Sequence, residues 1–274
     1  MGSAGSSFRA IEKGPVMKKL TIVKIGGAVL DDSEKLTVFL NDFSKIEGAK
    51  ILVHGGGKMA TQLAKNLGVN TELIDGRRVT DKDTLPIAVM VYAGLINKQV
   101  VAQLQAAGCD AIGLSGADGG LIQTVKRSTA VLDYGFVGDC TSESIDVSRL
   151  QQFLESGLCP VFSAITVDSQ GQLLNTNADT IASCLAIALA SSYNVSLVYC
   201  FEHKGVLQDI ENPNAVISSV DGSKFKLLKE TGVITKGMLP KIENARQAVE
   251  QGVSEVWIKG YMSLGQPEEG TCVQ

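Results

Sequence analysis

Short apolar runs alternate with helical patterns along most of this chain, and this alternation limits the folds open to it. The runs that indicate buried strands are Leu20–Ile25, Lys50–Val53, Ala111–Leu114, Val161–Ile165, Ser196–Cys200 and Glu255–Ile258, the last being the final strand expected. Strands that alternate with helices indicate βα units, and hence a mostly parallel sheet with helices on both faces. We therefore predict an α/β fold, a three-layer αβα sandwich.

Apolar residues at helical spacing mark the helices between these strands. The segments expected to be helical begin near Gly57, at Asp83, at Ala178 and near Pro240. By contrast, Leu121–Val137 alternates short β-like runs with turn residues, which predicts antiparallel hairpins inserted into the sheet.

Composition restricts the class of partner. The chain has 274 residues, of which 45% are apolar, and a net charge of −4 without any block of Lys or Arg. No nucleic-acid or membrane surface is therefore predicted, and small molecules are the expected partners. The six cysteines form no CxxC pair, which fits reduced thiols and a cytoplasmic location. Residues 1–16, rich in Gly and Ser, are expected to be a flexible tail or leader.

A lysine stands inside the first strand run. Lys24 interrupts Leu20–Ile25, and Gly26 and Gly27 follow directly. An unpaired ammonium in an apolar strand would cost several kcal/mol or lose its proton. Glycines beyond it allow backbone N–H groups to approach a ligand closely. The arrangement predicts an anion, with phosphate as the first hypothesis.

A second glycine turn, Gly55-Gly56-Gly57, lies between an expected strand and an expected helix. Free N–H groups and the helix dipole suit such a turn to an anion, although a tight βα turn with close packing explains it equally well. Two turns of this kind favour phosphate. Neither matches GxxxxGK[ST] or a full GxGxxG, so Walker-type and Rossmann sites are excluded.

Three further segments carry polar groups that could face one ligand. Lys241 follows Pro240 in the first turn of a helix, where either solvent or an anionic ligand would stabilise its charge. Asn175, Asn177 and Asp179 would share one side of an extended segment, although Asn177 or Asp179 could instead cap the helix that begins near residue 178.

Gly76-Arg77-Arg78-Val79-Thr80 places two guanidinium groups in an expected loop. They would suit a substrate carboxylate or be ordinary surface arginines. His54 could be a base, but no Ser or Cys nucleophile motif adjoins it, which favours a structural role. His203 is open to both readings.

In order, these segments resemble the amino acid kinase family, and within it the N-acetyl-L-glutamate kinases, from about Met17 to Thr271. The motifs that carry the resemblance are Lys24-Ile25-Gly26-Gly27, Val53-His54-Gly55-Gly56-Gly57, Gly76-Arg77-Arg78-Val79-Thr80, Asn97-Lys98, Asn175-Thr176-Asn177-Ala178-Asp179 and Gly237-Met238-Leu239-Pro240-Lys241. The resemblance implies transfer of phosphate from ATP, with Mg²⁺, to the γ-carboxylate of N-acetyl-L-glutamate or a related N-acylglutamate in arginine biosynthesis. It also implies a homodimer. The acyl group stays open.

The resemblance also implies a role for each site residue. By it, Lys24 and Lys241 stabilise the transferring phosphoryl group and Asp179 orients both ammonium groups. The residues expected to bind phosphate through N–H groups are Gly26, Gly27 and Gly56, and those expected to hold the acylated amino acid are Gly55, Arg78 and Asn175. Residues 17–173 would form the lobe for the acyl substrate and the dimer contacts, and residues 174–274 the nucleotide lobe.

One segment departs from the family pattern. Where the family usually has Asp-Val-x-Gly, this chain reads Glu202-His203-Lys204-Gly205, so the contacts to base and ribose are expected to differ there. Two alternatives remain: a sibling kinase acting on another carboxylate, carbamate or nucleotide, and a regulatory module that binds nucleotide or amino acid without turnover. The presence of Lys24, Lys241 and Asp179 favours turnover.

Overall fold

A computed structural model describes residues 17–274 except 75–76, 131, 210, 232, 235–237 and 267. The predicted tail of residues 1–16 lies outside these described residues, as do Gly76 and Gly237 of two motifs. The main sheet contains β1 (Lys19–Ile25), β2 (Ala49–His54), β5 (Ala111–Leu114), β8 (Cys159–Ser163), β11 (Asn194–Phe201), β12 (Ser219–Val220), β13 (Glu255–Gly260) and β14 (Thr271–Val273).

The strands of this eight-stranded sheet follow the order β12-β14-β13-β11-β1-β2-β8-β5. Each neighbouring pair is parallel except β13 and β14, which are antiparallel. β1 lies between β11 and β2, and its residues from Ile22 to Ile25 are buried. The mostly parallel sheet predicted from the alternating pattern is confirmed.

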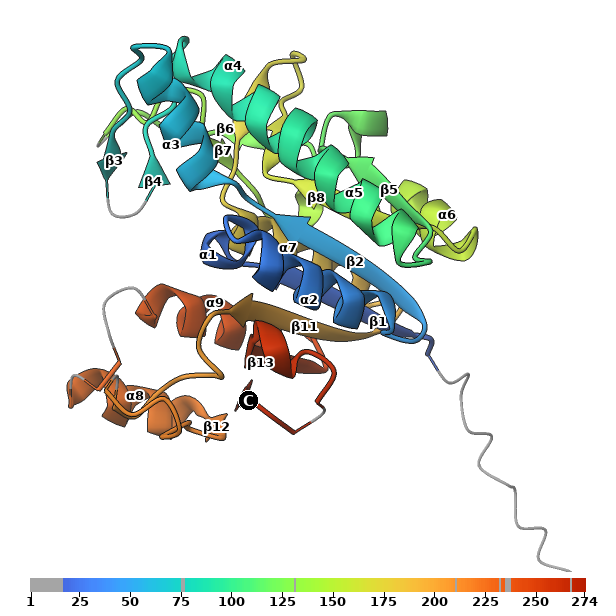
Figure 1. Ribbon diagram of the computed structural model, residues 1–274, viewed down its shortest axis with the longest axis vertical. Coiled ribbons are helices and arrows are strands. Elements are labelled where there is room, and N and C mark those ends of the chain that lie inside the picture. The colour runs from blue at the N-terminus through green and yellow to red at the C-terminus, as the bar shows by residue number, and fades with distance from the viewer. Residues whose placement is uncertain are drawn as a thin grey trace, which may run out of the picture.

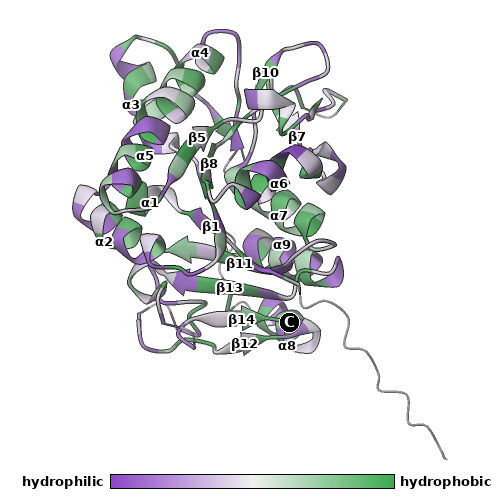
Figure 2. Ribbon diagram, turned by 90° about the vertical axis from the view of Figure 1, so that its right-hand side faces the viewer, coloured by the Kyte–Doolittle hydropathy of each residue, from purple (hydrophilic) through white to green (hydrophobic). Residues whose placement is uncertain are grey.

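Helices cover both faces of the sheet, as the edge-on view of Figure 2 shows, with α2 and α5 on one face and α6, α7 and α9 on the other. The helices are α1 (Gly27–Leu30), α2 (Ser33–Ser44), α3 (Gly57–Asn66), α4 (Thr84–Val89), α5 (Asn97–Ala106), α6 (Val147–Glu155), α7 (Ala178–Leu189), α8 (Gly222–Glu230) and α9 (Leu239–Glu250). Short 3₁₀ turns lie at η2 (Asp118–Gly120), η3 (Ser142–Ser144) and η4 (Tyr261–Ser263). The three-layer αβα architecture is therefore confirmed (Figure 1).

Several details differ from the expectations. The expected last strand, β13, is followed by β14, which pairs antiparallel with it. The expected hairpin forms as β6 (Val125–Lys126) and β7 (Gly138–Asp139), but in a separate two-stranded sheet rather than inside the main one. These two-residue strands pair with each other and not with any strand of the main sheet.

Two other small ribbons lie at the same end of the fold. They are β3 (Leu73–Ile74) with β4 (Arg77–Arg78), and β9 (Ile165–Val167) with β10 (Leu173–Asn175). Backbone hydrogen bonds join the ribbons: the Thr80 N–H donates to Tyr134 O at 2.8 Å, and the Asn175 N–H donates to Phe136 O at 2.9 Å. The ribbons therefore form one connected rim.

The expected long helix contains a π-helical segment, η1 (Met90–Ile96), between α4 and α5. The whole segment Thr84–Ala106 passes a length and hydropathy test for a membrane span. One face of it packs into the core through side chains that include Val91, Ile96 and Leu104, each at most 3% exposed, whereas Met90 and Leu95 are about half exposed. Packing of this one face against the core accounts for part of the apolar composition of the segment.

Candidate functional site

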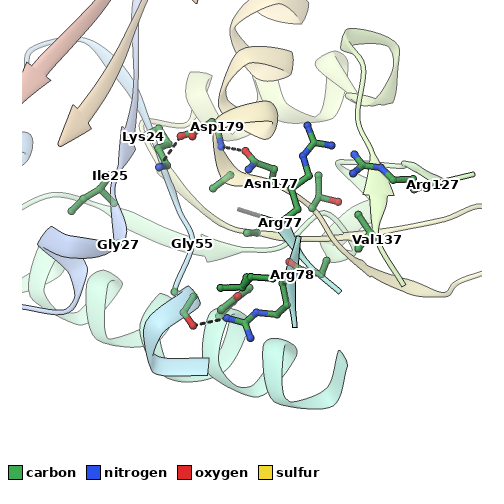
Figure 3. Close-up of a pocket in the computed structure, with 18 residues that line it drawn as sticks. Lys24, Ile25, Gly27, Gly55, Arg77, Arg78, Arg127, Val137, Asn177 and Asp179 are labelled. Atoms are coloured by element: carbon green, nitrogen blue, oxygen red, sulfur yellow. Dashed lines mark hydrogen bonds and ion pairs between the residues drawn. The ribbon is translucent and has the colours of Figure 1, made fainter. Parts of the chain in front are cut away.

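Lys24 and Asp179 form a nearly buried ion pair at the carboxyl end of the sheet (Figure 3). Lys24 Nζ lies 2.7 Å from Asp179 Oδ1, and the side chains are 10% and 16% exposed. Lys24 comes from β1 and Asp179 from the first turn of α7. Asp179 Oδ1 makes no well-directed hydrogen bond, so the contact is an ion pair that leaves this oxygen able to interact with a second cation. The anionic partner that Lys24 needs in its strand is therefore present within the fold.

Lys241 joins this pair from a separate helix. The Nζ atoms of Lys241 and Lys24 lie 4.4 and 5.4 Å from the centroid of the same Phe201 ring. Burial lowers the pKa of Lys241, the Asp179 carboxylate raises it, and the Lys24 ammonium lowers it further. We call Lys24, Asp179 and Lys241 the charged triad. A pair of ammonium groups beside one carboxylate carries net positive charge, which favours an anion.

The two glycine turns border the triad, but their glycines act differently. Gly26 donates its N–H to Cys200 O at 2.9 Å, so the N–H expected to bind phosphate is already engaged with β11 in this structure. A side chain at Gly26 would instead meet the Phe201 ring at 3.2 Å. The N–H groups of Gly27 and Gly56 donate to no described residue and are open to a ligand.

Gly56 has a backbone that only glycine adopts easily. Its φ is +154°, and a Cβ there would lie 2.3 Å from Ile96 Cδ1 and 2.9 Å from Tyr92 Cδ1. Both contacts belong to η1, so the π-helical segment packs directly against the turn. This packing fixes the amino end of α3, where Gly56 is the N-cap.

Arg78 is buried with part of its guanidinium unused. It is 8% exposed, and Nη2 donates to Gly57 O and to Thr61 Oγ1, each at 2.7 Å (Figure 3). Nε and Nη1 have no hydrogen-bond partner among the residues that the structure describes. Because unmet donors on a buried charged group are costly, these two atoms indicate an anionic ligand. Nε–H and Nη1–H lie on different edges of the guanidinium, so each can donate to a separate oxygen of a bound anion.

Asn175 and Asn177 have different structural roles. Asn177 caps α7, since its side chain accepts hydrogen bonds from the Asp179 and Thr180 N–H groups. The capping alternative is therefore correct for Asn177. Asn175, in β10, donates through Nδ2 to Thr80 Oγ1 at 2.9 Å. Its side-chain oxygen accepts no hydrogen bond from any described residue, so it can accept one from a ligand.

Most of these groups, but not Lys241, Gly26 or Phe201, line one cleft of about 230 Å³. Its lining includes Lys24, Gly27, Gly55–Gly57, Arg77, Arg78, Tyr92, Arg127, Val137, Asn175, Asn177 and Asp179. The cleft opens at the carboxyl ends of β1 and β2, where ligands bind in open α/β sheets. Gly55, expected to hold substrate, lies in it beside Ala178, with 3.9 Å between a Cβ built at Gly55 and that methyl group. The fold therefore gathers in one cleft residues from four separate sequence motifs.

The departing segment 202–205 lies next to a smaller apolar pocket of about 120 Å³, lined by His203, Gly205, Val206, Leu207, Val233, Ile234 and Met238. Glu202 turns away from this pocket and pairs with Lys35 at 2.8 Å. Gly205 is closely packed, because a Cβ there would meet Thr271 Oγ1 at 2.7 Å.

Sequence reasoning missed Phe201, Tyr92 and Arg127 as parts of this region. Phe201 ends β11 next to the triad, and a residue at the carboxyl end of a central parallel strand is the signal that could have identified it. Arg127 stands in the expected hairpin segment, and no local pattern relates it to the cleft.

His54 lies in the core and does not line the cleft. Its Nδ1 hydrogen bonds to Gly55 O at 2.9 Å, and Nε2 contacts Asn97 Nδ2 at 3.1 Å, which fits a proton on Nδ1. Asn97 also donates to Val161 O at 2.9 Å. Burial lowers the pKa of His54 to about 4, so the ring is neutral at pH 7. The structure thus favours the structural role over that of a base.

The burial of His54 predicts how the free energy of unfolding depends on pH. The pKa is about 6.5 in the unfolded chain and about 4 in the fold, so between these values the unfolded state binds more protons. The free energy of unfolding is expected to fall by up to about 3 kcal/mol as the pH drops through this window. Urea titrations of the wild type and His54→Gln measure it: the difference between them should shrink toward low pH. If the free energies of unfolding of the two proteins changed with pH in parallel, the assignment of His54 as a buried neutral ring would be contradicted.

Comparisons with known proteins agree with this geometry. The model of the amino acid kinase family matches residues 19–260. An acetylglutamate kinase from Cytophaga hutchinsonii is 50% identical, covering 88% of this chain and 91% of its own length. An acetylglutamate kinase from Parabacteroides distasonis is 49% identical, covering 88% and 94%. The crystal structure of smu.665 from Streptococcus mutans superposes with a TM-score of 0.74 at 28% identity, covering 93% and 98%. With its αβα sheet and its charged triad, this chain belongs to the amino acid kinase family.

Proposed function

We propose that this chain phosphorylates the γ-carboxylate of N-acetyl-L-glutamate, or a related N-acylglutamate, with ATP, as a step of arginine biosynthesis. The relatives at 49 and 50% identity bear the name acetylglutamate kinase and are matched over most of their length. The observation that carries the proposal is that one cleft holds both the Lys24–Asp179 ion pair of the charged triad and the unmet donors of buried Arg78. The end of the cleft at Lys24 and Asp179 suits a phosphoryl group, and the end at Arg78 suits a carboxylate.

In the proposed reaction, a γ-carboxylate oxygen attacks the γ-phosphorus of ATP. A new P–O bond forms while the bond to the β-phosphate oxygen breaks, and ADP leaves with that electron pair. The attacking carboxylate is already ionised at pH 7, so no base is needed. Catalysis then depends on alignment and on charge stabilisation.

Each part of the charged triad has a role in this step. Lys24 and Lys241 would stabilise negative charge on the transferring group, and Asp179 would orient the two ammonium groups. Gly27 and Gly56 would donate free N–H groups to phosphate oxygens, while Gly26 allows close approach. The donors lie on rigid elements, which reduces reorganisation during the reaction.

Mg²⁺ would enter with ATP and neutralise phosphate charge. Asp179 is the carboxylate in the described lining of the cleft, and it is paired with Lys24. This donor set fits an ion held by phosphate oxygens and water rather than by a protein cage.

We place the adenine in the apolar pocket beside Gly205, with His203 as a neighbour of base or ribose. This pocket and Lys241 both follow residue 174, which supports a nucleotide lobe at 174–274 and an acyl-substrate lobe at 17–173. The main sheet continues across this boundary through the β1–β11 pairing.

A homodimer and a cytoplasmic location complete the proposal. Met90 and Leu95 of η1 are 52% and 49% exposed, which supplies an apolar surface for a second copy on the acyl-substrate lobe. All six cysteines are described and free, in agreement with a reducing compartment.

Arg78→Lys tests the substrate end of the cleft. Lysine keeps the charge but loses the two unmet donors that the rigid guanidinium holds in place, so KM for N-acetyl-L-glutamate is expected to rise at least about tenfold, with a smaller change in kcat. Steady-state ADP release measures both constants. Thr61→Val is the matched control, since it removes one Arg78 partner without touching the unmet donors. Equal effects of both variants would reduce Arg78 to a support for α3 and contradict the role.

A further inference from the structure

The cleft contains more arginine than the proposed substrate needs. Arg78 can hold one carboxylate, and the triad lies at the phosphoryl end. Arg77 and Arg127 also line the cleft. In Figure 3 their side chains point toward one another, on the side of the cleft opposite Gly27. A pair of cations facing each other is unfavourable until an anion lies between them.

Arg77 is free to bind. It belongs to β4, next to Arg78, and its side chain makes no hydrogen bond or ion pair with any residue in the described part of the chain. Arg78, its neighbour, donates one hydrogen bond to Gly57 O of α3 and keeps two unmet donors. The two arginines are therefore available to different parts of a ligand. A surface arginine with no partner is common, but this one lines the same cleft as Lys24 and Asp179.

Arg127 is held in position before any ligand arrives. Its guanidinium lies 5.3 Å from the centroid of the Tyr134 ring, and Nε donates to Asp139 Oδ1 at 2.8 Å. Nη2 contacts the same Asp139 oxygen, which leaves Nη1 without a partner among the described residues. The Arg127 side chain is 20% exposed. A stacked, partly buried guanidinium loses little freedom on binding a carboxylate.

The rim of the cleft fixes the relation between these two arginines. Arg77 lies on the β3–β4 ribbon, and Arg127 directly follows β6. The Thr80 backbone joins the two segments, since its N–H donates to Tyr134 O at 2.8 Å and its carbonyl accepts from the Phe136 N–H at 2.6 Å. Arg127 also donates its own N–H to Val137 O at 2.8 Å. The pair is therefore part of a connected framework.

We propose that Arg77 and Arg127 form a second carboxylate subsite, which selects N-acylglutamates whose acyl chain itself ends in a carboxylate. This inference rests on the proposed function and specifies its substrate class. N-succinyl-L-glutamate is the simplest probe, because its acyl chain is short and carries a terminal carboxylate. The γ-carboxylate then meets the triad, the α-carboxylate meets Arg78, and the acyl carboxylate meets the arginine pair.

The test compares three substrates in an ADP-release assay. They are N-succinyl-L-glutamate, its terminal amide N-succinamoyl-L-glutamate, which has the same shape without the charge, and N-acetyl-L-glutamate. The kcat/KM for the succinyl compound is expected to exceed that for the amide at least about tenfold, because charge-assisted hydrogen bonds are stronger than neutral ones. Equal values would overturn the subsite while leaving the kinase assignment intact. Turnover of none of the three would instead contradict the proposed function.

Variants then assign the effect to the arginine pair. Arg77→Gln is the cleaner change, since it removes a charge that has no partner. It is expected to lower the succinyl-to-amide ratio of kcat/KM at least about fivefold. Arg127→Gln should act in the same direction. Lys126→Gln is the matched control, because Lys126 adjoins Arg127 but packs over Phe136, 4.9 Å from its ring centroid, and does not line the cleft.

The same variants separate this proposal from a phosphate-binding role for the pair. Were Arg77 and Arg127 to hold ATP, KM for ATP would rise in both variants while the substrate ratio stayed constant, and the subsite would be wrong. The predicted preference should also weaken as salt rises, since the pair is partly exposed.

Discussion

Replacement of Lys241 with methionine is expected to lower kcat at least about a hundredfold, with a smaller change in either KM. Groups that stabilise charge developing in a transition state commonly contribute about 3 kcal/mol or more. Lys241 Nζ shares the Phe201 ring with Lys24 and is within electrostatic reach of Asp179. Methionine keeps much of the side-chain volume, so the loss reports on charge. Single-turnover and steady-state ADP release would measure the change.

Lys24→Met is expected to have a loss of the same order, but it also leaves a buried carboxylate unpaired. The variant Lys24→Met with Asp179→Asn removes both charges and should regain stability without regaining activity. Lys45→Met is the control, because Lys45 is exposed and pairs only with Asp42 at the far end of α2. Near-normal turnover in a folded Lys24 or Lys241 variant would contradict the roles given to the charged triad.

Gly56→Ala is expected to lower the free energy of unfolding by at least about 2 kcal/mol, since strained backbone and overpacking each cost roughly 1–3 kcal/mol. The φ of +154° disfavours any L side chain, and the new Cβ would lie 2.3 Å from Ile96 Cδ1. Activity should fall as well, because the turn that positions the free Gly56 N–H would shift. Chemical denaturation and ADP release measure the two effects.

A double-mutant cycle isolates the clash at this turn. Ile96→Val removes the Cδ1 atom that the alanine would meet, at a cost of about 1 kcal/mol by itself. In that background Gly56→Ala should cost at least about 1 kcal/mol less than in the wild type. Partial recovery is expected, since the backbone strain and the Tyr92 contact remain. Strict additivity of the two changes would show that η1 does not constrain the turn.

Much of the fold could be predicted because its signals are local. The apolar run around Lys24 is buried on both faces of a parallel sheet, so it needs no alternation to be recognised. The π-helical segment could not be predicted, since Met90–Ile96 keeps ordinary apolar spacing and its packing against Gly56 is a tertiary contact. Leu67 continues the i, i+4 spacing of Met59 and Leu63, yet it is 58% exposed, because α3 ends just before it.

In the candidate site, too, some residues could be recognised from local sequence and others only from the tertiary structure. A lysine inside a strand is locally anomalous, so Lys24 predicted an anionic partner before any fold was known. The identity of that partner, Asp179, came from the resemblance, because the two residues are distant in sequence. Phe201 and Arg127 reach the site only through tertiary structure, and Gly26 looked like a donor because nothing local shows its bond to Cys200. The sequence therefore indicated an anion-binding site, and the fold showed which atoms contact one another in it.

The most direct measurement is a hydroxamate trapping assay on the wild-type protein with ATP and Mg²⁺. Hydroxylamine converts an acyl phosphate to a stable hydroxamate, so it reports formation of the proposed product itself. N-acetyl-L-glutamate or N-succinyl-L-glutamate should give a γ-hydroxamate together with ADP in equal amounts. N-acetyl-L-glutamine, which has no γ-carboxylate, should give neither. Absence of hydroxamate with every N-acylglutamate, from a folded protein, would contradict the account.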